Sequence, residues 1–146
     1  MMKPVAATIL AGVLALGACA PASNNTATSS AVLPAAAAAD ANVTARGSFV
    51  GKSKHITTGH GSIGRVGKKW VVILENDFVF DGAPDPHVAL GKDGYDKNAS
   101  LALLSSNEGQ QVYEIPASLN VANFNEIWIW CDKFSVPLGV AKLTLT

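Results

Sequence analysis

Two uninterrupted apolar runs, at residues 70–74 and 127–131, the second preceded by Glu126, are the clearest elements of the hydrophobic pattern. Both are rich in β-branched and aromatic residues and are bounded by polar or turn residues, which is typical of strands covered on both faces. We expect both to be central strands. Shorter strands are predicted at 48–51, 61–66, 87–90, 111–115 and 140–145, and the glycine and proline segments between them predict turns.

Many short strands at this spacing predict an all-β fold, either a small antiparallel β-sandwich or a flattened barrel. At most one short helix is expected. Its place is the segment Ser-Leu-Ala-Leu-Leu at residues 100–104, which is rich in helix-forming residues.

The N-terminus has the order of an export signal. A basic start at Lys3 leads into an apolar stretch at 5–16, which is shorter than the roughly 20 residues of a spanning helix. The sequence Leu-Gly-Ala-Cys at 16–19 resembles a bacterial lipobox, in which the thiol of Cys19 receives a diacylglycerol. The alternative is an ordinary secretory signal cut near Ala18 or Ala22.

Composition divides the chain into three parts: a lipoprotein signal peptide at 1–18, a lipid-anchored tether at 19–45 and a β domain at 46–146. The tether is rich in Ala, Ser, Thr, Asn and Pro and contains no aromatic residue. Ala20 follows the cysteine where an Asp would resemble an inner-membrane retention signal. The expected location is therefore the periplasmic face of a bacterial membrane, with the outer membrane favoured.

Charge and motifs exclude several classes of function. Eleven basic residues balance eleven acidic ones, for a net charge of +0, which predicts no nucleic-acid surface. The sequence carries no Gly-x-Ser-x-Gly motif and no phosphate-binding loop between a strand and a helix. No signature of a stand-alone enzyme is therefore present, and no metal or cofactor is assigned.

The chain has two cysteines, and acylation of Cys19 would leave Cys131 without a partner in its own chain. In an extended strand, Cys131 shares a face with Ile127 and Ile129. It is then either a buried, inert thiol or, because a charged pair follows it at the strand's end, a partly open and reactive one. A reactive thiol could form a mixed disulfide, a sulfenic acid or a bond to metal or haem.

The three histidines, His55, His60 and His87, follow no local metal-binding pattern. His55 and His87 are expected to orient the backbone or to pair with aspartates. Three aspartates recur every four residues, at Asp77, Asp81 and Asp85, which fits turns and pairing with Lys or His better than a calcium loop.

Three groups of residues resemble the DM-thirteen domain, a small domain that accompanies DOMON modules in animal proteins. They are Gly47-Ser48-Phe49 with His55 and Gly59, the stretch from Asp77 to His87, and Trp130 to Phe134 with Val136, Gly139 and Ala141. The resemblance covers residues 46–145 in order. One departure is Leu138, where many animal members have Phe before the glycine.

The resemblance implies a β-rich fold and an electron-transfer or redox role centred on Cys131. It also makes Asp77, Asp85, His87 and His55 candidates for the polar surroundings of that thiol. No DOMON module accompanies the domain in this sequence, so a haem-bearing or DOMON partner would come from another chain.

Two functions remain open from the sequence. The first is a lipid-anchored periplasmic accessory domain that transfers electrons through Cys131 together with a redox partner protein. The second is a non-catalytic binding or structural module of the envelope in which Cys131 only packs.

Overall fold

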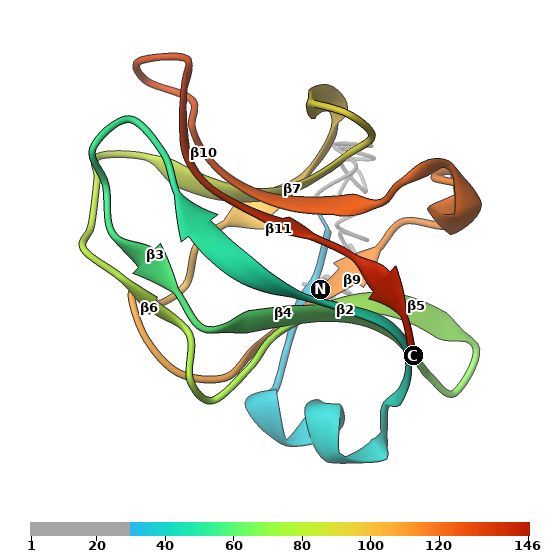
Figure 1. Cartoon of the computed structure of the whole chain (residues 1–146). Coiled ribbons are helices and arrows are strands. Elements are labelled where there is room, and N and C mark those ends of the chain that lie inside the picture. Colours follow the sequence, from blue (N-terminus) through green and yellow to red (C-terminus); the bar gives the residue numbers. More distant parts are fainter. Residues whose placement is uncertain (1–29) are drawn as a thin grey trace, which may run out of the picture.

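The structure, a computed structural model, describes residues 30–146. Within this range the chain forms short strands and two 3-10 helices and contains no α-helix (Figure 1). The elements in chain order are β1 (Val32–Leu33), η1 (Ala35–Asp40), β2 (Asn42–Gly51), β3 (Thr57–Thr58), β4 (His60–Val66), β5 (Lys69–Leu74), β6 (Val79–Phe80), β7 (Pro86–Gly91), β8 (Tyr95–Leu103), β9 (Gln111–Ile115), η2 (Val121–Asn123), β10 (Glu126–Cys131), β11 (Val136–Lys142) and β12 (Thr144–Leu145). The predicted all-β fold is confirmed.

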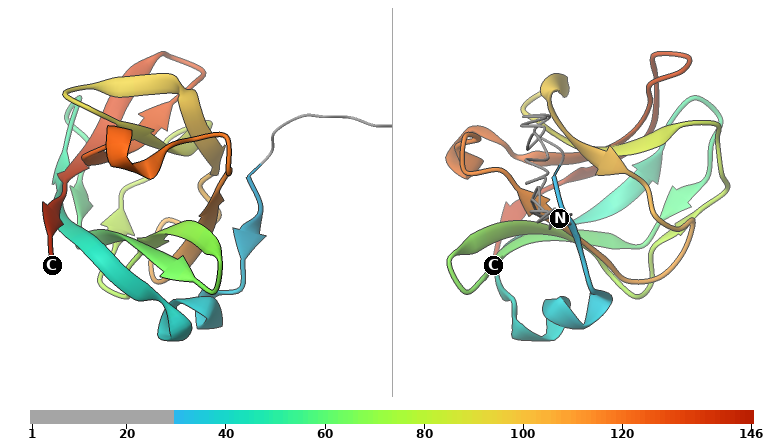
Figure 2. Two further views of the ribbon diagram at one scale, coloured as in Figure 1. Left: turned by 90° about the vertical axis from the view of Figure 1, so that its right-hand side faces the viewer. Right: turned by 180° about the vertical axis from the view of Figure 1, so that it is seen from behind.

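One large antiparallel sheet curls into a flattened, nearly closed barrel (Figure 2). Its strand order is β1-β9-β5-β4-β2-β11-β10-β7-β8, with β12 beside β2, while β3 and β6 form a separate two-stranded ribbon. The long strand β2 pairs with β4 through residues 42–48 and with β11 through residues 49–51. It therefore links the two halves of the barrel.

The two apolar runs of the sequence lie in the centre of the sheet, as predicted. Strand β5 lies between β4 and β9, and β10 lies between β7 and β11. In β10 the burial alternates, because Ile127, Ile129 and Cys131 point into the core while Trp128 and Trp130 remain partly exposed on the outer face. The outer face of β10 is thus less covered than the sequence suggested.

The predicted helix at residues 100–104 is wrong. Residues 95–103 form β8, which pairs with β7, and Ala99 and Leu101 alternate into the core. Burial against the sheet outweighs the helix preference of a short Ala- and Leu-rich segment, because propensity is a weak effect over so few residues. The helical residues among 30–146 lie instead in the 3-10 segments η1 and η2. Neither segment was predicted from the sequence.

The fold reaches into the segment that composition placed in the tether. Strand β1 pairs Val32 with Tyr113, and Leu33 packs against a small apolar cluster on the outer side of β5 and β9 together with Ala38 and Ala41. Strand β2 also begins at Asn42. Ala38 and Ala41 complete this cluster. The absence of aromatic residues, on which the expected tether at 19–45 was based, does not reveal that such small side chains pack onto the domain.

The signal peptide and Cys19 lie outside the described residues. Among residues 30–146, none of the helices has the length and apolar character needed to cross a bilayer.

Candidate functional site around Cys131

Cys131 ends β10 with its side chain turned into the core, and its exposed fraction is 1%. It lies opposite Pro86 of β7 and Val136 of β11. A register shift between Ile129 and Trp130 interrupts the β10–β11 pairing just before it. The thiol is therefore not partly open, as its place at a strand end suggested, because a neighbouring loop covers it.

The covering loop is residues 81–85, between β6 and β7. The Cys131 thiol donates a hydrogen bond to the Pro84 carbonyl oxygen at 3.0 Å, which requires the sulfur to carry its proton. The backbone N–H of Asp132 donates to the Asp85 carbonyl oxygen at 3.2 Å. Asp85 has a φ of 63°, in the left-handed region that non-glycine residues rarely adopt. Two hydrogen bonds thus hold this part of the loop over the sulfur.

A histidine and two carboxylates lie together beside this loop. His87 Nε2 lies 3.0 Å from Asp85 Oδ1 and 3.6 Å from Asp132 Oδ2. Among the described residues, neither carboxylate forms an ion pair with a lysine or arginine, and one ligand atom from each of the three side chains falls within 4.8 Å of the others. The cluster places one imidazole against two carboxylates, and this donor set fits a divalent cation.

Aromatic side chains extend the site along the outer face of the sheet. Tyr95 of β8 stacks on Trp130 with ring centroids 4.0 Å apart and planes inclined by 2°, and Trp128 meets Trp130 edge-on at 6.5 Å. The Tyr95 hydroxyl lies 3.5 Å from Asp132 Oδ1. Burial, together with the negative charge of Asp132, raises the pKa of Tyr95, so its phenol stays protonated at neutral pH.

The predicted site residues His55, Asp77, Asp85 and His87 lie in three separate histidine–aspartate pairs, which also include Asp81 and His60. Asp85 and His87 pair beside the loop that covers Cys131, but His87 lies opposite Trp130 and so faces the outer side of the sheet, away from the Cys131 thiol. His55 Nδ1 pairs with Asp81 Oδ1 at 2.9 Å. Asp77 pairs with His60 at 2.6 Å, away from Cys131. The three evenly spaced aspartates thus bind three different histidines and do not converge on one cation.

The pKa shifts of these carboxyls follow from their hydrogen bonds. The hydrogen bond from the His60 side chain lowers the pKa of Asp77. The pKa of Asp81 is lowered mainly by the backbone hydrogen bond of Ile56, and to a smaller extent by the hydrogen bond from the His55 side chain.

A second group that could ligate a metal, His60, Glu75 and Asp77, already has a cation beside it. Arg46 Nε and Nη2 bind the two Glu75 carboxylate oxygens at 2.7 and 2.6 Å. The guanidinium therefore occupies the electrostatic place that a metal ion would take.

Sequence reasoning did not count Asp132 and Tyr95 among the candidate site residues. Asp132 had a local signal, because it directly follows the cysteine. Tyr95 had none, since β8 brings it to Trp130 from more than thirty residues away (130 − 95 = 35).

The DM13 family, described as electron transfer DM13, matches residues 48–143. The match spans most of the described barrel and includes Cys131 and the aspartate and histidine residues around it. The chain therefore belongs to the DM13 family, a class of electron-transfer domains. No curated protein and no solved structure matches the chain.

Proposed function

We propose that this chain is an electron-transfer module whose working group is the Cys131 thiol, reached by a partner protein when the loop 81–85 opens. The observation that carries the proposal is the contact between Cys131 Sγ and the Pro84 carbonyl, at the barrel end where His87 and its two carboxylates gather. A cover held by few hydrogen bonds permits transient access to a thiol that is otherwise protected from oxidants.

A lone thiol works by exchange with another molecule. Cys131 is the one free cysteine among residues 30–146. Its thiolate attacks one sulfur of a partner's disulfide, a new S–S bond forms, and the partner's other sulfur leaves with the electron pair as a thiolate. The thiol proton passes to solvent. A further thiol then attacks the Cys131 sulfur, and the partner's first sulfur leaves as a second thiolate, so the partner's disulfide has gained two electrons. Cys131 is left in a disulfide with the incoming thiol, and exchange with one more thiol releases it.

The same proposal places the module on a membrane through a lipid on Cys19. Support comes from the sequence Leu-Gly-Ala-Cys at 16–19 and from the short apolar stretch before it. Each buried CH2 of an acyl chain contributes about 0.8 kcal/mol, so several chains on one cysteine would hold the protein firmly. Ala20 favours the periplasmic face of the outer membrane.

The decisive experiment loads the thiol with a small disulfide. A Cys19→Ala chain, which keeps Cys131 as its single thiol, is incubated with oxidised glutathione under native conditions and analysed by intact mass. We expect one glutathione per folded chain, released by dithiothreitol, and none on a matched Cys19→Ala, Cys131→Ser chain. Adduct formation only after unfolding would contradict the proposal.

A second candidate function, an envelope module in which Cys131 only packs, is favoured by the 1% exposure of that residue. The thiol also belongs to the main core cluster with Ile129 and Leu138. In that case Cys131→Ala, which keeps a small apolar side chain, restores the phenotype of a deletion strain as well as the native chain does. An electron-transfer role through the thiol predicts that Cys131→Ala fails to restore it.

A further inference from the structure

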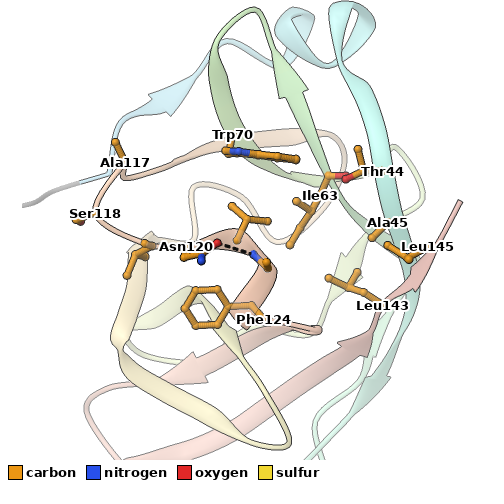
Figure 3. Close-up of a pocket in the computed structure, with 13 residues that line it drawn as sticks. Thr44, Ala45, Ile63, Trp70, Ala117, Ser118, Asn120, Phe124, Leu143 and Leu145 are labelled. Carbon is orange, nitrogen blue, oxygen red and sulfur yellow. Dashed lines mark hydrogen bonds between the residues drawn. The ribbon is translucent and has the colours of Figure 1, made fainter.

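The opposite end of the barrel from Cys131 contains an open apolar pocket of about 800 Å³ (Figure 3). Strand β10 runs from this end, where it follows Phe124, to Cys131 at the other. Its six residues span roughly 20 Å at about 3.3 Å each, so the pocket and the thiol are separate sites. Mouths of β-barrels are frequent ligand sites, and pockets that bind small molecules commonly measure about 300–1,000 Å³.

The residues that line the pocket define the chemistry of its occupant. They are Thr44, Ala45, Ile63, Trp70, Ala117, Ser118, Leu119, Asn120, Val121, Ala122, Phe124, Leu143 and Leu145, and none of them is charged. An ionised carboxylate or phosphate would be desolvated there without a partner, which is costly, so a neutral ligand is favoured.

Two aromatic side chains favour a ring over a flexible chain. Trp70 and Phe124 lie on opposite sides of the pocket, with Ile63 of the core between them (Figure 3). Arg65 lies 5.2 Å from the centre of the Trp70 ring and helps to hold it in place, although it does not line the pocket. Rigid aromatic walls gain contact with a flat ring at little cost in conformational entropy.

Of the three polar side chains that line the pocket, Thr44, Ser118 and Asn120, the amide of Asn120 is held in a fixed orientation and gives a direction to the ligand. The Asn120 side-chain oxygen accepts a hydrogen bond from the backbone N–H of Ala122 at 3.1 Å and so caps η2. Its amide nitrogen is then available as a donor. Thr44, by contrast, already donates its hydroxyl to the Ile63 carbonyl at 3.2 Å.

We propose that this pocket binds a neutral, ring-containing apolar small molecule, with its ring against Trp70 and Phe124 and a hydrogen-bond acceptor facing Asn120. The site is independent of the thiol chemistry at the other end of the barrel. It assigns to the domain a small-molecule ligand in addition to a protein partner.

The test uses benzophenone, a neutral two-ring ketone that forms covalent bonds to nearby C–H groups under light. The purified full-length chain is irradiated with it, and the attachment points are mapped by peptide mass spectrometry. We expect labels to concentrate on pocket residues such as Leu119, Val121 and Leu143. An excess of naphthalene should suppress them, and an excess of decanol, a neutral flexible chain, should not.

Variants that fill the pocket provide the control. Ala122→Trp and Ser118→Trp each place a large ring in the pocket from an exposed position and should reduce labelling at pocket residues about tenfold or more. The matched Ala39→Trp, at an exposed position of η1 outside the pocket, should leave labelling unchanged. Two filling variants keep the test valid if one of them misfolds, which circular dichroism detects.

Three results would overturn the proposal. Labels scattered over the surface would show that the pocket has no preference for the probe. Equal labelling of the filled and native chains would place the binding elsewhere. Equal competition by decanol and naphthalene would refute the preference for a ring.

Discussion

The loop over Cys131 allows its accessibility to be predicted in numbers. Opening the loop at Pro84 and Asp85, with Asp81 still bound to His55, removes the Cys131–Pro84 and Asp132–Asp85 hydrogen bonds. Each contributes about 0.5–1.5 kcal/mol net, so opening costs about 1–3 kcal/mol. The exposed Asp85–His87 contact adds little to the cost. The open fraction is then roughly one in five to one in 150. Alkylation of Cys131 by iodoacetamide should be slower by that factor in the native chain than in the unfolded chain at the same pH.

The assay measures alkylation of Cys131 by mass spectrometry over time in a Cys19→Ala chain. Replacing Pro84 by Ala gives the open loop more conformational entropy and so lowers the free energy of opening by about 0.4–1 kcal/mol. Labelling should then be about two- to fivefold faster. Pro34→Ala, at the start of η1 far from this loop, is the matched control and should have no effect.

Two outcomes would refute the reasoning about the loop. Labelling as fast as in the unfolded chain would mean that the loop provides no cover. Protection of several thousand-fold or more would mean that the sulfur is reached only by global unfolding, which costs about 5–15 kcal/mol in typical domains. That second outcome would also support Cys131 as a packing residue.

Three further predictions test the scaffold and the anchor. Arg46 lowers the pKa of Glu75, so this ion pair stabilises the fold at pH values above the unfolded-state pKa near 4.5, and its contribution is lost as the pH falls through the lower folded-state pKa. Arg46→Met should therefore lower the free energy of unfolding in urea titrations at pH 7, and the difference from the native chain should shrink in acid. Gly139→Ala should cost about 1–3 kcal/mol in the same titrations, because its new Cβ would lie 2.6 Å from the Thr57 side chain; an unchanged midpoint would contradict this packing. Cys19→Ala should abolish incorporation of labelled palmitate and release the chain from membranes, and a chain that remains labelled would exclude this anchor.

The strands were predictable because burial in this fold leaves a local pattern. The continuous run at residues 70–74 and the alternation from Ile127 to Cys131 both follow from the side-chain period of a strand. The segment at 100–104 misled the prediction because its helix-forming residues are used for burial against β7. Strand β1 was invisible because only two residues form it and their partner lies eighty residues further along the chain (Val32 with Tyr113).

The candidate site was predictable in its residue types but not in its geometry. The sequence indicated that His55 and His87 would orient the backbone or pair with aspartates, and both pair with aspartates. His60, for which no such pairing was predicted, does so too. The sequence offered no means to decide that Asp77 would pair away from Cys131 while Asp85 would lie beside it, because strand register makes that choice. The cover over the thiol depends on the Pro84 carbonyl, and a backbone group has no signal of its own in the sequence.

Strand β1 has a practical consequence for anyone who trims this chain. Val32 and Leu33 occupy the outer edge of β9, and the Ala31 carbonyl accepts from the Glu114 N–H at 2.9 Å. A chain begun at Arg46, where composition suggests a boundary, would leave those backbone groups unpaired along an apolar strand. Such a bare edge recruits the edge of another molecule, so the shortened protein should self-associate where the longer one stays dispersed.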